Sequence, residues 1–327
     1  MNRAATLLNA TLVWDNHTCL PLRPDDLQFL PMLKRHRQMG VNVVSVNVGF
    51  GSDSIEQHIR MLAHYRQWIR DHPEDYLLVQ TTTDVQRAKS EGKLGVTFDI
   101  EGAGAVSNQA SLVGLYYDLG VRWMLIAYNK NNLVGGGCHD DDTGLTPYGG
   151  TVLDEMHRVG MVVCCSHTGP RTVAEVIDHV DGPVIFSHSN ARALKEHPRN
   201  ITNAMMQACA AKGGVIGING IGIFLGDNDN STATFLRHVD HAVQLIGPAH
   251  VGIGLDYVYD AQDLADFLKS NASIFPPNSG YDTTVNMVSP EQFPEIVEGM
   301  IRLGYDDAAI SGILGGNFYR VAEAVWK

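Results

Sequence analysis

The sequence alternates short, apolar, β-branched runs with amphipathic stretches of helical periodicity, and this alternation constrains the fold more than any other feature. Near-continuous apolar runs, such as residues 161–165, are typical of parallel strands that are covered on both faces. The predicted strands are 12–17, 41–48, 95–101, 121–128, 161–167, 183–189, 214–218 and 250–256. Eight strands alternating with helices favour a (β/α)8 barrel over its rival, a doubly wound open sheet.

Helical patterns fill most of the intervals between these strands. They are expected at 24–39, 54–71, 112–119, 150–159, 170–179, 202–212 and 232–246. Several begin with capping residues or Pro, and Gly40, Gly120, Gly160 and Gly213 follow helices as C-terminal stops.

The chain of 327 residues has no linker-like run of Pro, Gly or Ser that would divide it. Single α/β barrels often exceed about 250 residues, so we expect one barrel domain over residues 1–327. The turn-rich stretch 261–289 is predicted to be a loop insertion after the eighth strand. Residues 290–327 are predicted to form a C-terminal helical segment.

The composition excludes several classes of partner and location. The 24 Lys and Arg residues against 36 Asp and Glu give a net charge of −12, which argues against nucleic acid or an anionic membrane as the main partner. A spanning helix is not expected, because no run of about 18 apolar residues occurs. The N-terminal residues are expected to lead straight into the first strand without a signal peptide, and five cysteines do not suggest a disulfide framework. A cytoplasmic protein is therefore expected.

Polar residues interrupt the apolar strands at their C-terminal ends. They are Asp15 and His17 in the first strand, Asp99 and Glu101 in the third, His167 in the fifth, His188 in the sixth and Asp256 in the eighth. These ends meet on one face of a barrel, where active sites are built. Each residue alone has a structural explanation, such as capping the next helix. Their repetition at one structural position predicts a site for one or two divalent metal ions of the zinc type.

Three segments of the sequence resemble the membrane (renal) dipeptidase family: residues 94–102 (LGVTFDIEG), 183–189 (PVIFSHS) and 251–256 (VGIGLD). Their order and spacing also fit that family, and the similarity covers nearly the whole chain, from Val13 to Val325. Members of the family are (β/α)8 metallohydrolases of the amidohydrolase type that cleave dipeptides with two zinc ions.

The resemblance implies roles for individual residues. Glu101 would bridge the metals, with His167 and His188 on one ion and His17 on the other. Arg199 falls where the family places an arginine that holds the substrate's carboxylate, a task that suits a bidentate guanidinium. A solvated arginine at a helix start is its structural alternative. Asp256 falls at the position of the family's acid/base aspartate.

The sequence departs from the family pattern at two positions. The first strand ends His17-Thr18-Cys19, where the family has His-x-Asp. Either the Cys19 thiolate replaces the ligand carboxylate, or that metal is weakly held or absent and Glu101, His167 and His188 form a single-metal site. A simple buried cysteine is the remaining alternative. Tyr128 falls where better-known members carry a histidine that steadies the scissile carbonyl; a phenol can donate a hydrogen bond to a developing oxyanion, or merely pack the barrel mouth.

The function expected from the resemblance is metal-dependent hydrolysis of dipeptides by a metal-activated hydroxide, with Asp256 passing the proton to the leaving amine. Some relatives accept a D-residue at the C-terminal position of the substrate. A homodimer is implied by the resemblance alone. Two alternatives stay open: an amidohydrolase acting on N-acyl amino acids or other small amides, and a barrel that binds metal or ligand without catalysis. The Gly-rich acidic run 135–142 is expected to be a loop that lines or covers the pocket.

Overall fold

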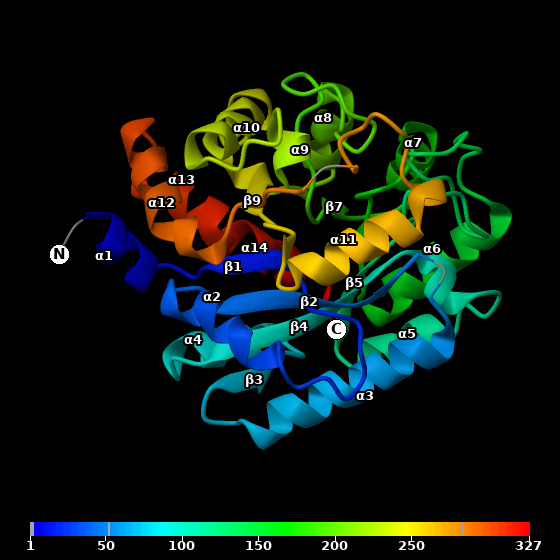
Figure 1. Cartoon of the computed structure of the whole chain (residues 1–327), viewed down its shortest axis with the longest axis horizontal. Helices are drawn as coiled ribbons and strands as arrows, with labels where there is room; N and C mark the ends of the chain where they lie inside the picture. Colours follow the sequence, from blue (N-terminus) through cyan, green and yellow to red (C-terminus); the bar gives the residue numbers. More distant parts are fainter. Residues whose placement is uncertain (1–2, 52, 283) are drawn as a thin grey trace.

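The computed structural model describes residues 3–51, 53–282 and 284–327. Parallel strands form a closed barrel with helices around it (Figure 1). The barrel strands are β1 (Trp14–Cys19), β2 (Val43–Phe50), β4 (Leu94–Glu101), β5 (Val121–Leu125), β6 (Val162–Cys164), β7 (Ile185–Phe186), β8 (Val215–Ile218) and β9 (Val251–Ile253). Each strand pairs with the next, and Asp15 of β1 pairs with Ile253 of β9, which closes the barrel. The predicted (β/α)8 barrel is confirmed, and the open sheet is wrong.

Helices precede the first strand, connect the strands and follow the last one. They are α1 (Arg3–Ala10), α2 (Lys34–Gln38), α3 (Ile55–Asp71), α4 (Thr82–Ser90), α5 (Leu112–Asp118), α6 (Pro147–Val159), α7 (Pro170–His179), α8 (Asn203–Ala211), α9 (Gly222–Leu225), α10 (Thr232–Ile246), α11 (Ala261–Ser270), α12 (Phe293–Arg302), α13 (Asp307–Ser311) and α14 (Asn317–Val325). Side-chain caps fix several starts: Ser54 accepts a hydrogen bond from Gln57 in α3, and Thr146 precedes Pro147 of α6.

The sequence prediction differs from the structure in several places. The helix expected at 24–39 is helical only from Leu30, first as a 3₁₀ turn (Leu30–Leu33) and then as α2. The N-terminal residues do not lead straight into β1, because α1 precedes it; Met1 and Asn2 lie outside the described residues. A short strand, β3 (Tyr76–Leu78), pairs with β4, and α4 follows it. A two-residue strand, β10 (Tyr257–Val258), pairs with β1. Strands of two or three residues, such as β10 and β3, carry too few residues for a periodic pattern.

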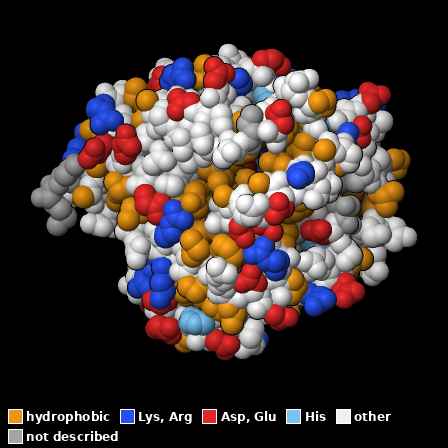
Figure 2. Space-filling view, viewed as in Figure 1, with side chains coloured by type: hydrophobic (Ala, Val, Ile, Leu, Met, Phe, Trp, Pro, Cys, Tyr) orange, Lys and Arg blue, Asp and Glu red, His pale blue; other side chains and the backbone are white. Residues whose placement is uncertain are grey.

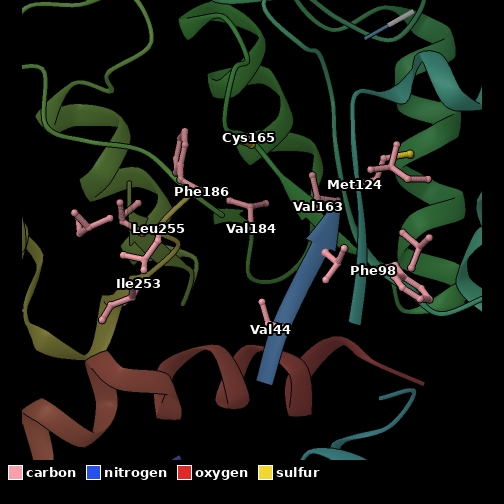
Figure 3. Packing of buried hydrophobic residues seen from close by; sticks show 14 of the residues in the cluster. Val44, Phe98, Met124, Val163, Cys165, Val184, Phe186, Ile253 and Leu255 are labelled. Atoms are coloured by element: carbon pink, nitrogen blue, oxygen red, sulfur yellow. The ribbon is translucent and has the colours of Figure 1, made fainter. Parts of the chain in front are cut away.

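Two apolar clusters hold the barrel. The larger one lies between the strands and the surrounding helices; Figure 3 shows part of it, including Val44, Met124 and Val163. The smaller one joins Trp14, Trp123 and Ile185 to Phe318 of α14. A Cβ atom at Gly252 would collide with the Phe318 ring, so glycine is needed there for α14 to approach β9.

The stretch 261–289 is not all loop as predicted, because helix α11 occupies residues 261–270 and crosses the view of the barrel in Figure 1. Of the C-terminal helices, α12 packs against α1, and α14 packs against β8 and β9. Among the described residues, no helix combines the length and the apolar character that a membrane crossing requires.

Candidate metal centre and active site

Three histidines converge on one oxygen atom of Glu101, the last residue of β4. Oε1 of Glu101 lies 3.4 Å from Nε2 of His17, 3.4 Å from Nε2 of His167 and 3.0 Å from Nε2 of His188. Nε2 of His167 and Nε2 of His188 are 3.0 Å apart, and the rings of His17 and His188 stack at 4.1 Å. All four side chains are buried. Strand ends far apart in the sequence therefore aim four metal-type ligands at one point.

Cys19 and Asp256 lie beside the same cluster. Sγ of Cys19 is 3.4 Å from Nε2 of His17, and Oδ1 of Asp256 is also 3.4 Å from that nitrogen. Three overlapping groups have ligand atoms within 4.8 Å of one another: His17, Cys19 and Glu101; Glu101, His167 and His188; and His17, His188 and Asp256. His17, His188 and Glu101 each belong to two of these groups, and of the three only the Glu101 carboxylate has two oxygen atoms with which to share two ions.

The donor chemistry of the cluster fits a bound cation. Nδ1 of His167 lies 2.7 Å from Oδ1 of Asn129, an atom that can only accept, so Nδ1 carries the proton and Nε2 presents a lone pair. That lone pair faces Nε2 of His188 and Oε1 of Glu101. Within the described part of the chain, Oε1 of Glu101 is buried and has no hydrogen-bond partner. Lone pairs gathered around a buried carboxylate oxygen are stabilised by a metal ion.

A second layer of residues orients these ligands. Ser187 Oγ lies 2.8 Å from Nδ1 of His188, and Asp99 Oδ1 lies 3.2 Å from Nδ1 of His17. Asp99 in turn accepts a hydrogen bond from Ser45 at 2.6 Å. The Ser187 contact fixes the direction of the His188 ring, and the nearby Asp99 carboxylate favours a proton on Nδ1 of His17.

Two site residues leave the strands with left-handed backbone conformations. His167 follows β6 with φ 59°, and Asp256 follows β9 with φ 58°. This conformation is uncommon for residues other than glycine, and it is frequent at functional sites. Asn219 donates to Oδ2 of Asp256 at 2.8 Å, which leaves Oδ1 facing His17.

Burial and mutual charge shift the titration of the cluster. Burial raises the pKa of Glu101 to about 8, and it lowers the pKa of His167 and His188 well below their usual range, so both imidazoles are neutral. Burial also lowers the pKa of His17, but Asp99, Cys19 and Glu101 outweigh it and leave that pKa well above the usual value. Burial raises the pKa of Cys19 to about 12.

A cavity of about 400 Å³ opens above these residues. Cys19, Glu101, Tyr128, His167 and Asp256 line it, together with apolar side chains from α9, α11 and the following segment. Its volume falls in the range of small-molecule pockets. Reactive groups at the base of a largely apolar cavity form an arrangement suited to a small substrate.

Comparison with known proteins gives the family. Residues 2–271 match the model of the membrane dipeptidase family, peptidase family M19. The chain belongs to this family. An amidohydrolase structure from Pseudomonas aeruginosa is 26% identical, with 99% of each chain covered and a TM-score of 0.91. An uncharacterized Klebsiella pneumoniae protein in the pqqA 5′ region is 27% identical, covering 84% of this chain and 98% of that protein.

A further structure shares the fold: a Rhodobacter sphaeroides metallopeptidase, solved with a phosphinate mimic of the dipeptide L-Ala-D-Ala, is 19% identical, covers 97% and 100% of the two chains and has a TM-score of 0.79. The chain spans 48%, 60% and 59% of the dipeptidases of Schizosaccharomyces pombe, Clonostachys rogersoniana and Claviceps purpurea that it matches. As a member of a peptidase family, this protein is a hydrolase.

Tyr128 and Arg199 are the two predicted site residues of this dipeptidase-family chain that lie outside the ligand cluster. The Tyr128 ring stacks on His167 at 4.4 Å and lines the cavity. Arg199 is 2% exposed; its Nη2 donates to the carbonyl oxygen of His188 at 2.7 Å and its Nη1 to Ser189 Oγ at 3.1 Å. Nε of Arg199 is buried without a hydrogen-bond partner among residues 3–51, 53–282 and 284–327. The structure thus ties Arg199 to the loop that carries His188.

Several residues that support the ligand cluster and the cavity were not predicted from the sequence. Asn129 and Ser187 carry no distinctive sequence signal, since single Asn and Ser residues are common in loops. The predicted loop 135–142 is positioned by its own side chains: Asp142 accepts hydrogen bonds from the backbone of Arg171 and Thr172 at the start of α7. His139 from the same loop lies 2.8 Å from the hydroxyl of Tyr281, which lines the cavity.

Proposed function

We propose that this protein is a zinc-dependent dipeptidase. The observation that carries the proposal is the convergence of three imidazole Nε2 atoms on Oε1 of Glu101, 3.0–3.4 Å away, at the base of the cavity. Membership of the membrane dipeptidase family supports the reaction class. Imidazole and carboxylate ligands around one open cavity are the usual composition of a catalytic zinc site.

The ligands divide into two sets that share Glu101. His167 and His188 complete one set, while His17 and Cys19 complete the other. These residues would hold zinc, which when bound would supply a water of lowered pKa and a Lewis acid for the amide carbonyl. If Cys19 is not a ligand and the set around His17 holds no metal, one ion per chain remains, at Glu101, His167 and His188.

Asp256 is placed to move the proton. Asn219 holds one of its carboxylate oxygens, and the other faces the cluster, where it can accept a proton from the attacking water and return it to the leaving amine. The hydroxyl of Tyr128 can donate a hydrogen bond to the developing oxyanion, since its ring rests on His167 at the edge of the cavity. Arg199 brings a buried guanidinium beside His188 and would neutralise the C-terminal carboxylate of a dipeptide.

The decisive experiment measures bound metal and dipeptide hydrolysis in the same preparations. Wild type is expected to contain one or two zinc ions and to turn over dipeptides. His188→Ala is expected to lose metal and activity, whereas His157→Ala, a change at an exposed histidine of α6, should keep both. A metal-free wild type whose activity is indifferent to His188→Ala would end the proposal.

A second candidate is an amidohydrolase acting on N-acyl amino acids or other small amides. The observations that favour it are Cys19 and Tyr128, which depart from the family pattern, and the largely apolar cavity. A parallel assay of dipeptides and their N-acetylated counterparts separates the two candidates. The inhibitor in the Rhodobacter sphaeroides metallopeptidase mimics a dipeptide ending in D-Ala, so the assay should include L-Ala-D-Ala beside L-Ala-L-Ala. The homodimer and the cytoplasmic location stay predictions.

A further inference from the structure

A continuous series of aromatic rings lines the cavity above the metal ligands. Tyr128 stacks with Phe50 at 5.3 Å, Phe50 meets Phe267 at 4.7 Å, Phe267 meets Phe275 at 5.7 Å, Phe275 meets Tyr281 at 4.7 Å and Tyr281 meets Phe224 at 6.0 Å. All six side chains line the cavity. In Figure 2, orange hydrophobic side chains gather near the centre of the visible face, in the region crossed by α11 in Figure 1. The walls of the cavity are therefore mainly apolar and aromatic.

Helix α11 contributes the outer wall and leaves its apolar face incompletely covered. Leu264, Phe267 and Leu268 line the cavity, yet every residue of α11 is exposed or half-buried. The helix is anchored by its polar side, because Arg23 donates hydrogen bonds to Asp260 at 3.0 Å and to Asp263 at 2.7 Å. Apolar surface held in place but still open to solvent is stabilised when an apolar ligand covers it.

The series of rings begins beside Arg199 and ends on the ring of His167. The guanidinium of Arg199 lies 5.8 Å from the ring of Phe224, at one end of the series. Phe50 and Phe267 lie toward the other end, next to Tyr128. If Arg199 binds the C-terminal carboxylate, as the proposed function has it, the N-terminal residue of the substrate extends toward Phe50 and Phe267.

We propose that Phe50, Leu264 and Phe267 form an apolar subsite for the side chain of the substrate's N-terminal residue. The preferred substrates are then dipeptides that begin with a large apolar residue, such as Phe or Leu, rather than Gly or an acidic residue. This inference rests on the proposed function.

The charges of the cavity support the exclusion of acidic side chains. Beyond the metal-ligand cluster, its wall includes the carboxylates of Asp263 and Asp266 on α11. The guanidinium of Arg23, which also lines it, is already paired with Asp260 and Asp263. An acidic N-terminal side chain would meet like charge and an apolar wall, and both disfavour binding.

The test compares kcat/KM for Phe-Ala, Leu-Ala, Gly-Ala, Glu-Ala and Lys-Ala with the zinc-loaded full chain. Covering a Phe side chain is expected to favour Phe-Ala over Gly-Ala by about tenfold or more. Phe267→Ala should reduce this ratio at least about fivefold, and Phe267→Leu should give an intermediate ratio. Lys269→Ala, an exposed change on the same helix, is the matched control and should keep the wild-type ratio.

A binding measurement separates this inference from the proposed function. Calorimetry would compare phosphinate analogues of Phe-Ala and Gly-Ala, which are not hydrolysed. If wild type hydrolyses no dipeptide yet binds the Phe analogue about tenfold more tightly, and Phe267→Ala removes the difference, the subsite stands and the proposed function fails. If wild type hydrolyses dipeptides but treats Gly-Ala or Lys-Ala as well as Phe-Ala, the subsite is overturned. A preference that Phe267→Ala leaves unchanged overturns it too.

Discussion

The sulfur atom of Cys19 lies 3.4 Å from Nε2 of His17, on the same side of the cluster as Oδ1 of Asp256. His17 and Cys19 are separated by one position in β1, so the alternation of the strand directs both side chains to the same face. The membrane dipeptidase pattern that this sequence resembles has an aspartate at the position of Cys19. A sulfur ligand in place of an oxygen ligand changes the spectroscopy of a bound metal, and this makes the substitution testable.

Loading the protein with Co²⁺ is expected to produce a near-ultraviolet charge-transfer absorption from the Cys19 thiolate to the metal. Cys19→Asp should keep the metal content and abolish the band, because it replaces sulfur by a carboxylate oxygen. Cys209→Ala removes a buried cysteine that bonds to the carbonyl of Val184 and should leave the band unchanged. A Co²⁺-loaded wild type without this absorption would show that Cys19 is not a ligand.

Asn129 controls the tautomer of His167 through the 2.7 Å contact with Nδ1. Replacing it by Ala removes the acceptor, so the proton can shift to Nε2 and the ring loses its fixed direction. We expect Asn129→Ala to weaken zinc binding about 10–100-fold, as measured by competition with a chelator. Asn131→Ala is a control in the same loop, where the amide of Asn131 bonds to the carbonyl oxygen of Asp141. Equal metal affinity in wild type and Asn129→Ala would contradict the orienting role.

The barrel could be predicted from the sequence because each strand is an apolar run whose length and composition identify it locally. The ends of parallel strands meet on one face by topology, so His17, Glu101, His167 and His188 could be grouped before any distance was known. In the structure the Nε2 atom of each of the three histidines lies 3.0–3.4 Å from Oε1 of Glu101.

The rest depends on tertiary geometry that leaves no local pattern. The strands are shorter than the apolar runs: β6 ends at Cys164 although the predicted strand continues to residue 167, and His167 has a left-handed backbone. The contact of Asn129 with His167 joins positions 38 residues apart. Which side chains of α11 line the cavity depends on where the helix lies over the barrel. The turn-rich sequence around it predicted only a loop.

Asp256→Asn tests proton transfer at the site. Asn has the same shape and tolerates the left-handed conformation of this position, so the fold and the zinc content are expected to be retained. The amide cannot accept the proton, and kcat should fall about 10²–10⁴-fold. Steady-state kinetics with parallel metal analysis checks this. A variant that retains metal and loses less than about tenfold in kcat would remove Asp256 from the proton path.

Arg199→Lys tests recognition of the substrate's carboxylate. Lysine keeps the charge but cannot donate to His188, Ser189 and a carboxylate with the same planar geometry. We expect KM for a dipeptide to rise about tenfold or more, with a smaller change for the matching dipeptide amide, which has no carboxylate. If both substrates lose the same factor, Arg199 acts only by supporting the loop of His188.

His238 is expected to make stability depend on pH at a position outside the metal cluster. Its Nδ1 accepts a hydrogen bond from the backbone N–H of Ala191 at 3.2 Å and its Nε2 donates to the carbonyl oxygen of Leu225 at 2.9 Å, so protonation of Nδ1 would break the bond from Ala191. Burial lowers its pKa to about 4. Between about pH 6.5 and pH 4 the unfolded chain therefore binds a proton that the folded chain rejects, and the free energy of unfolding decreases as the pH falls.

The contribution of His238 is fully present above about pH 6.5, and its loss toward pH 4 is at most about 3 kcal/mol. Urea unfolding at several pH values, with a chelator present throughout, should show a shallower pH dependence for His238→Gln than for wild type. His157→Gln changes an exposed histidine and should keep the wild-type slope. Other buried histidines titrate in both proteins, so the difference between the two slopes isolates His238. Identical slopes for wild type and His238→Gln would show that this ring is protonated as readily in the folded chain as in the unfolded one.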